Sequence, residues 1–96
     1  MEIAELQRTL NDTYFERDER RGTDATFRWL TEEVGELAKA LRRGVPDELA
    51  LEFSDVLAWL ASLANLTGID LESAAARYAA GCPKCGASPC TCEFVA

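Results

Sequence analysis

The sequence has 96 residues, 48% of them hydrophobic, and a net charge of −7 from 17 acidic and 10 basic residues. A chain this short forms one small domain with little surface to bury on its own, so we expect a second copy to complete its apolar faces. The acidic balance argues against a nucleic-acid backbone as the main partner, because such proteins usually present a basic surface. It is compatible with a small anionic substrate only if metal ions bridge the substrate to the protein.

The start of the chain is acidic and amphipathic, with neither the basic region nor the apolar region of a signal peptide. No run of residues approaches the roughly 20 apolar residues of a membrane span. We therefore expect a cytoplasmic protein without a membrane partner.

Apolar residues repeat with helical period along most of the chain, and no stretch alternates with period two. The first predicted helix covers residues 2 to about 18, with an interruption expected near Asn11–Asp12. It ends in a charged run, residues 16–21, which is typical of a solvated face. The alternative is that Arg17 or Arg21 contacts a phosphate, which a planar guanidinium pairs with well.

The second predicted helix is capped by Thr23 or Asp24 and continues to Arg43. Gly35 lies in its middle, where glycine destabilises a helix by about 1 kcal/mol relative to alanine. This glycine indicates the close approach of either a neighbouring helix or a ligand.

The third and fourth predicted helices complete the domain. The third runs from Pro46, which is favoured in a first turn, to about Leu66. The fourth is capped by Asp70 and covers residues 71 to 80. The predicted fold is therefore an all-α, four-helix domain over residues 1–81, completed by oligomerisation and followed by an irregular cysteine-rich tail, 82–96.

Two acidic patterns lie in the second and third predicted helices, E-E-x-x-E at residues 32–36 and E-x-x-D at residues 52–55. At about 100° per residue, Glu52 falls inside the apolar stripe of its helix and Asp55 borders that stripe. On the preceding helix Glu33 lies at the margin of the apolar face. Facing these helices would bring four carboxylates to one partly buried place: Glu33, Glu36, Glu52 and Asp55.

Four such carboxylates repel one another and lose hydration, so a cation must neutralise them. The nearby basic residues Lys39, Arg42 and Arg43 lie further along the helix. A hard divalent ion with oxygen ligands, Mg²⁺ or Mn²⁺, suits a site built from carboxylates without histidine. The alternative interpretation is a solvated acidic face with ordinary surface ion pairs.

Two tryptophans accompany the acidic patterns. Trp29 lies on the same side of its helix as Glu33, and Trp59 follows Asp55 by one turn. Aromatic residues at this spacing are typical of a core; the alternative is that they stack on a base or sugar beside the metal.

The tail carries the four cysteines of the chain: Cys82, Cys85, Cys90 and Cys92. The pattern C-P-x-C-G followed by C-x-C is typical of a Cys₄ zinc knuckle, although only four residues separate the two pairs. Such a zinc would be structural, because sulfur fills all four positions. Disulfides or free thiols are the alternative.

These residues resemble a known family. The two acidic patterns, followed by the sequence LANLxGIDL at residues 63–71, resemble the MazG-like nucleotide pyrophosphohydrolases of the all-α NTP pyrophosphatase superfamily, over about residues 14 to 80. The cysteine tail is similar to that of a small subset. One departure is that Tyr78 and Cys82 stand where many relatives carry a lysine and an asparagine.

The resemblance implies a hydrolase acting on phosphoric anhydrides. It would cleave a nucleoside triphosphate between the α and β phosphates to the monophosphate and pyrophosphate, in nucleotide-pool house-cleaning. The implied Mg²⁺ ligands are Glu33, Glu36, Glu52 and Asp55, with Glu32 near the metal-bound water and Trp59 against the sugar. Family members assemble as homodimers or homotetramers.

Our mechanistic hypothesis is that Glu32 or Glu33 orients or deprotonates the attacking water. A rival hypothesis is a non-catalytic helical adaptor whose zinc knuckle binds a protein or nucleic acid. The net charge and the acid inside an apolar stripe stand against this rival.

Overall fold

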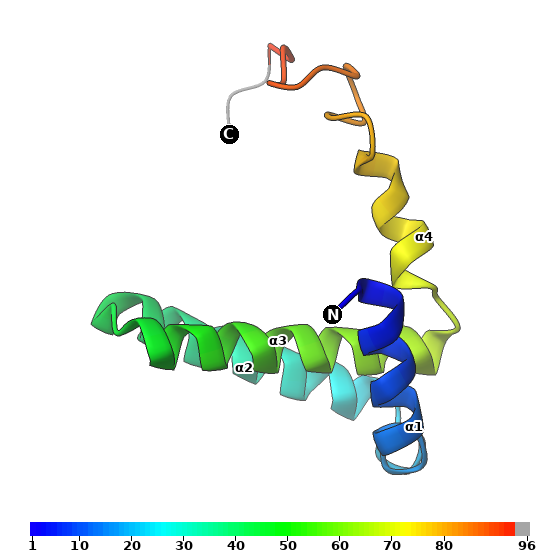
Figure 1. The fold of residues 1–96 in the computed structure, drawn as a ribbon. Helices are drawn as coiled ribbons and strands as arrows, with labels where there is room; N and C mark the ends of the chain where they lie inside the picture. Colours follow the sequence, from blue (N-terminus) through cyan, green and yellow to red (C-terminus); the bar gives the residue numbers. More distant parts are fainter. Residues whose placement is uncertain (94–96) are drawn as a thin grey trace.

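The computed structural model describes residues 1–93 of the chain (Figure 1), and residues 94–96 of the predicted tail lie outside the described residues. Four helices follow one another: α1 (Ile3–Arg21), α2 (Thr23–Arg43), α3 (Pro46–Thr67) and α4 (Leu71–Ala75). A 3₁₀ turn, η1 (Ala76–Tyr78), continues α4. The prediction of an all-α, four-helix fold is confirmed.

Helices α2 and α3 form an antiparallel hairpin, and α1 crosses one end of it (Figure 1). The hairpin turn is short because Gly44 ends α2 in the left-handed conformation, with φ at 67°, and its N–H donates to the Ala40 carbonyl at 2.9 Å. Pro46 then starts α3, where a missing backbone N–H does no harm. The central helix, α3, therefore packs against both α1 and α2.

Three local predictions were wrong. The N-cap of α2 is Gly22, so neither Thr23 nor Asp24 caps this helix. Helix α1 runs through Asn11–Asp12 without interruption, because both side chains are exposed and the small helix penalty of these residue types is outweighed by the flanking turns. The fourth helix keeps α-helical geometry only to Ala75 instead of residue 80. Residues 72–80 are all exposed, so no packed face stabilises a longer helix there.

One side chain of α1 fastens the start of α4 to the rest of the bundle. The Gln7 amide nitrogen donates to the Ile69 carbonyl at 2.6 Å, and its amide oxygen accepts from the Leu71 N–H at 2.9 Å. The Asn65 amide donates in turn to the Gln7 carbonyl at 3.1 Å. Asp70 caps α4 as predicted, accepting from the Glu72 N–H at 3.1 Å.

Helix α3 is long and apolar enough to cross a membrane by length and composition, with a mean hydropathy of 1.3 over its most apolar window. No uninterrupted run of about 20 apolar residues occurs in α3, and the window reaches this hydropathy with at most two charged residues among its alanines and leucines. A central helix of a bundle has the same composition. Only 17% of the window is buried within the chain.

Much apolar surface is open. The radius of gyration is 15.7 Å, against about 12 to 13 Å for a compact domain of this length. Figure 1 shows why: α4 and residues 82–93 project away from the α1–α3 bundle. On α3, one exposed apolar stripe is formed by residues spaced four and three apart, Phe53, Leu57 and Leu60.

Candidate functional site

Three carboxylates meet between α2 and α3. Glu33, Glu52 and Asp55 are half-buried, and one ligand atom from each lies within 4.8 Å of the others. Glu52 has an Oε2 atom that is buried without a hydrogen-bond partner among the described residues. Such an orphaned carboxylate oxygen is unfavourable unless a donor or cation reaches it.

The neighbouring carboxylates change the pKa of Glu33. Burial raises the pKa of the Glu33 carboxyl, and the negative charges of Asp55 and Glu52 raise it further. In its protonated form Glu33 hydrogen-bonds to Asp55. The ionised form of Glu33 is therefore disfavoured without a cation, and the donor set of the cluster fits a hard divalent cation that prefers oxygen ligands.

The other two predicted acids lie apart from this cluster. Glu36 does not belong to the group of three, and it forms an exposed ion pair with Lys39 at 3.5 Å. Glu32 is exposed and lines a shallow hollow of about 260 Å³ with Arg28 and Trp29. The structure thus brings together three of the four predicted ligands, and Glu36 acts on Glu33 only through its charge.

A pocket of about 320 Å³ opens between α1 and α3 beside the carboxylates. Asp55 lines this pocket as well as belonging to the cluster. Its remaining wall combines aromatic and apolar side chains with two arginines: Leu10, Tyr14, Arg17, Asp18, Arg21, Ala58, Trp59 and Ser62. A single ligand can therefore reach the carboxylates and this pocket together.

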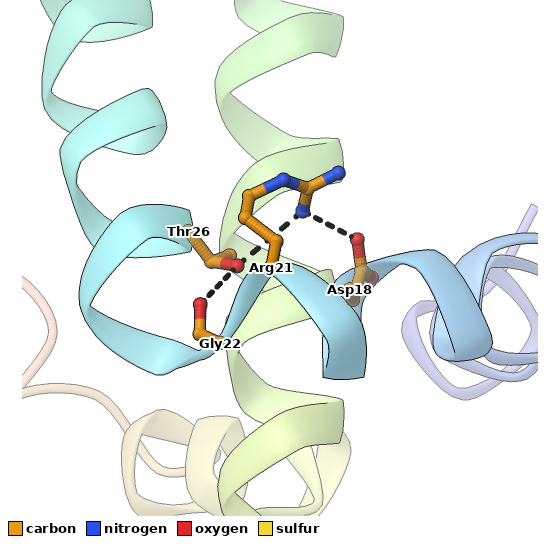
Figure 2. A network of polar contacts seen from close by, with 4 residues as sticks. All are labelled: Asp18, Arg21, Gly22 and Thr26. Atoms are coloured by element: carbon orange, nitrogen blue, oxygen red, sulfur yellow. Dashed lines mark hydrogen bonds and ion pairs between the residues drawn. The ribbon is translucent and has the colours of Figure 1, made fainter.

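Both predicted phosphate-contacting arginines line the pocket, and one of them is fixed by neighbours. Figure 2 shows the Arg21 guanidinium between Asp18 on α1 and Thr26 on α2. It donates to Asp18 Oδ1 at 2.8 Å and to the Thr26 hydroxyl at 3.3 Å, and that hydroxyl donates to the Gly22 carbonyl at 2.8 Å. The network links α1 to α2 beside the pocket, which Asp18 and Arg21 both line.

The two tryptophans contact each other. The Trp29 and Trp59 rings stack with centroids 5.9 Å apart and an angle of 12° between their planes. The Arg21 guanidinium carbon lies 4.8 Å from the centroid of Trp59. Trp59 lines the pocket, and Trp29 supports it from the side of α2.

Asp18 is the pocket residue that sequence reasoning missed. It belongs to the charged run interpreted as a solvated face, and for Asp18 this interpretation is wrong, because only 3% of the residue is exposed. A signal was present: Asp18 follows Tyr14 by four residues and Leu10 by eight, so it continues the apolar stripe of α1.

The four cysteines form a second cluster in the tail. All four sulfur atoms lie within 4.8 Å of one another, with Cys82 and Cys92 3.8 Å apart and Cys85 and Cys90 3.9 Å apart. These separations match the edge of about 3.8 Å expected for four sulfurs at 2.3 Å from a tetrahedral zinc. They are far from the roughly 2.05 Å of a disulfide, and all four cysteines are free.

Backbone hydrogen bonds lower the pKa of Cys82 and Cys85, whereas hydrogen bonds among the thiols, first with Cys90, raise the pKa of Cys92 to about 11. The Thr91 N–H donates to Cys85 Sγ at 3.4 Å, and this hydrogen bond, followed by one from Ala87, lowers the pKa of Cys85 to about 5. Gly81 allows the loop to close, since a Cβ there would meet the Ala87 carbonyl oxygen at 2.8 Å. No residue from 72 to 93 is buried, so a bound metal is the natural means of holding this loop.

A family model matches most of the chain. Residues 21–83 match the family model of the MazG nucleotide pyrophosphohydrolase domain. The matched segment contains α2, α3, α4 and the carboxylate cluster, and it covers more than half of the chain. No curated protein matches the sequence.

Proposed function

Because the chain belongs to the MazG nucleotide pyrophosphohydrolase family, we propose that it hydrolyses a nucleoside triphosphate between the α and β phosphates. The products would be the nucleoside monophosphate and pyrophosphate, with nucleotide-pool house-cleaning as the role. The observation that carries this proposal is the shared position of Asp55, which belongs to the carboxylate cluster and also lines the adjoining pocket.

Glu33, Glu52 and Asp55 would hold Mg²⁺ or Mn²⁺. The orphaned Oε2 of Glu52 and the raised pKa of Glu33 support this assignment, since both features disappear when a divalent cation binds. When bound, the ion supplies charge stabilisation for the phosphoryl oxygens and lowers the pKa of a coordinated water. Glu36, pointing outside the group, would act through its charge or through a water.

Side chains of the protein would activate the water and bind the phosphates and the nucleoside. Glu33 would orient the attacking water and accept its proton from its place in the carboxylate cluster. Arg17 and Arg21 offer cations to the phosphates from the rim of the pocket. Trp59 would contact the sugar or base from the wall of the pocket, and the exposed Glu32 is assigned no direct contact.

The cysteine cluster would hold a structural zinc ion. Sulfur separations of 3.8 and 3.9 Å support a tetrahedral Cys₄ site. Since four thiolates complete the coordination, the zinc would have no open position for substrate, and its role is to stabilise the tail.

The active form would be a homodimer or homotetramer. The exposed stripe of Phe53, Leu57 and Leu60 supports this, as does the projection of α4 from the bundle. Gly35 adds to it: a Cβ there would have nothing within 4 Å, so the space next to this glycine is open for another chain or a ligand.

The direct test is to incubate the protein with each of the common nucleoside and deoxynucleoside triphosphates in the presence of Mg²⁺. Stoichiometric monophosphate and pyrophosphate would support the proposal. Release of inorganic phosphate with a diphosphate, or no metal-dependent turnover of any nucleotide, would contradict it.

A further inference from the structure

Arg21 at the end of α1 is held in one position by three neighbouring side chains. Its Nη1 atom donates to Asp18 Oδ1 at 2.8 Å and to the Thr26 hydroxyl at 3.3 Å (Figure 2). The guanidinium carbon also lies 4.8 Å from the centroid of the Trp59 ring. A guanidinium fixed in this way loses little conformational freedom when a ligand binds, so its donors are oriented in advance.

The other donors of this arginine are open to a ligand. The Arg21 side chain is 23% exposed and lines the pocket beside the carboxylate cluster. Within residues 1–93 its hydrogen bonds are made by Nη1, which leaves Nε and Nη2 without a partner there. Asp55 of the cluster and Trp59 are one turn apart on α3, so about 6 Å separates them along the helix axis. A ligand with several linked phosphates is long enough to meet both the cluster and Arg21.

The ion pair between Asp18 and Arg21 is poorly suited to stability alone. Asp18 is almost fully buried, and its Oδ2 atom has no hydrogen-bond partner among the described residues. A buried ion pair loses hydration on both partners, and an unpaired oxygen adds to this cost, so such pairs often stabilise a fold less than apolar side chains of the same size. What the pair does supply is a fixed orientation of the guanidinium at the wall of the pocket.

We propose that Asp18 and Thr26 are positioning residues that orient Arg21 towards a phosphate group of the substrate. The proposal rests on the proposed hydrolysis of a nucleoside triphosphate and adds how its phosphates are recognised. Neither positioning residue needs to touch the ligand. The charge of Asp18 alone would repel a polyphosphate, so its contribution to binding comes through the orientation that it gives to Arg21.

The test measures the binding of inorganic pyrophosphate in the presence of Mg²⁺ by isothermal titration calorimetry. Asp18→Asn keeps the size of the side chain and removes its charge. If Asp18 did no more than add negative charge near the pocket, this variant would bind pyrophosphate more tightly than the wild type. The proposal predicts the opposite sign: binding should be weaker by about 10-fold, because Arg21 is no longer held in its orientation.

A double-mutant cycle shows whether the effect of Asp18 passes through Arg21. Arg21→Ala should weaken pyrophosphate binding by about 10- to 100-fold, and adding Asp18→Asn to it should cause no further loss. Thr26→Val removes the hydroxyl and should also weaken binding, whereas Thr26→Ser keeps the hydroxyl and should bind like the wild type. Glu48→Gln is the matched control, because it breaks an exposed ion pair with Arg43 at the hairpin turn and should leave binding unchanged.

Unchanged or tighter pyrophosphate binding in Asp18→Asn would overturn the proposal, as would an effect of Asp18→Asn that persists in the Arg21→Ala background. If Asp18→Asn does not fold, as judged by circular dichroism, the two Thr26 variants decide the matter, and equal binding by both would overturn the proposal. Pyrophosphate binding is measured without turnover, so absence of nucleotide hydrolysis contradicts the proposed function separately. A wild type that hydrolyses a triphosphate without binding pyrophosphate would contradict the positioning of Arg21 alone.

Discussion

Trp29 on α2 stacks on Trp59 on α3, with ring centroids 5.9 Å apart. The two rings have different surroundings on their outer sides: Trp59 lines the pocket with Asp55, and Trp29 lines the shallow hollow with Glu32. One contact thus joins the hairpin and supports the wall of the pocket.

Substitutions of the two stacked tryptophans should affect stability alike but substrate binding differently. Trp29→Ala and Trp59→Ala each remove the stack, so each should lower the free energy of unfolding by about 1 kcal/mol or more. Only Trp59→Ala removes a pocket surface, and its KM for the nucleotide should rise about 10-fold. Denaturant unfolding and steady-state kinetics measure the two effects. Equal KM changes in both variants would contradict the assignment of Trp59 to the pocket.

The raised pKa of Glu33 predicts the pH dependence of stability without metal. The folded state binds the Glu33 proton more tightly than the unfolded state, so in the interval between the ordinary value of 4.5 and the raised folded value the native chain holds more protons. Stability should therefore fall as pH rises through that interval. Glu33→Gln should flatten this dependence.

Mg²⁺ should reverse the trend, because it competes with the proton and binds more tightly as pH rises. Thermal melts with and without Mg²⁺ across the acidic range would measure both effects. The contradicting result would be that the metal-free wild type becomes more stable as pH rises through this interval and that Glu33→Gln shows the same pH dependence. The repulsion among the carboxylates would then have no effect on stability.

The tail should contain one zinc per chain. Metal analysis of protein purified without chelators should find it, and Cys82→Ser or Cys92→Ser should lose it. Because residues 82–92 project from the bundle (Figure 1), zinc removal should increase hydrogen exchange or proteolysis in this segment and leave the melting of α1–α3 largely unchanged. A disulfide content of two per chain by thiol titration would refute the zinc site.

The exposed stripe on α3 should lie in a subunit interface. Leu57→Arg places a charge in its middle and should shift the molar mass measured by light scattering from that of an oligomer to that of a monomer. Ile3→Arg changes an apolar residue of similar exposure on α1 and serves as the matched control. If the wild type is a monomer, or if Leu57→Arg has the same molar mass as the wild type, the stripe does not lie in a subunit interface.

The sequence was most informative where helical periodicity controls position. The placement of Glu52 inside an apolar stripe predicted its partial burial, and proline and glycine signals predicted the start of α3 and the ends of α2 and α3. The length of α4 was not predictable in the same way, since its termination depends on the absence of a packing partner. The family, by contrast, was recognisable from the spacing of the acids and is confirmed by the match over residues 21–83.

The candidate site depends more on how the helices cross. The exclusion of Glu36 from the group of three and the contact between Trp29 and Trp59 follow from the register of the α2–α3 hairpin, which a helical wheel does not contain. Asp18 was hidden because neighbouring charges in the run are exposed, and only the position of α1 across α3 buries it.

The central claim is that Glu33, Glu52 and Asp55 hold a divalent cation, and Mn²⁺ binding followed by electron paramagnetic resonance tests it most directly. Mn²⁺ prefers oxygen ligands to the thiolates of the tail, so the signal reports on the carboxylates. Wild type should remove free Mn²⁺ from solution saturably, and Glu52→Gln should bind at least about 10- to 100-fold more weakly while remaining folded. Glu48→Gln, an exposed acid on the same helix, should bind like wild type. If Glu52→Gln binds Mn²⁺ as tightly as wild type, these three side chains do not form the metal site.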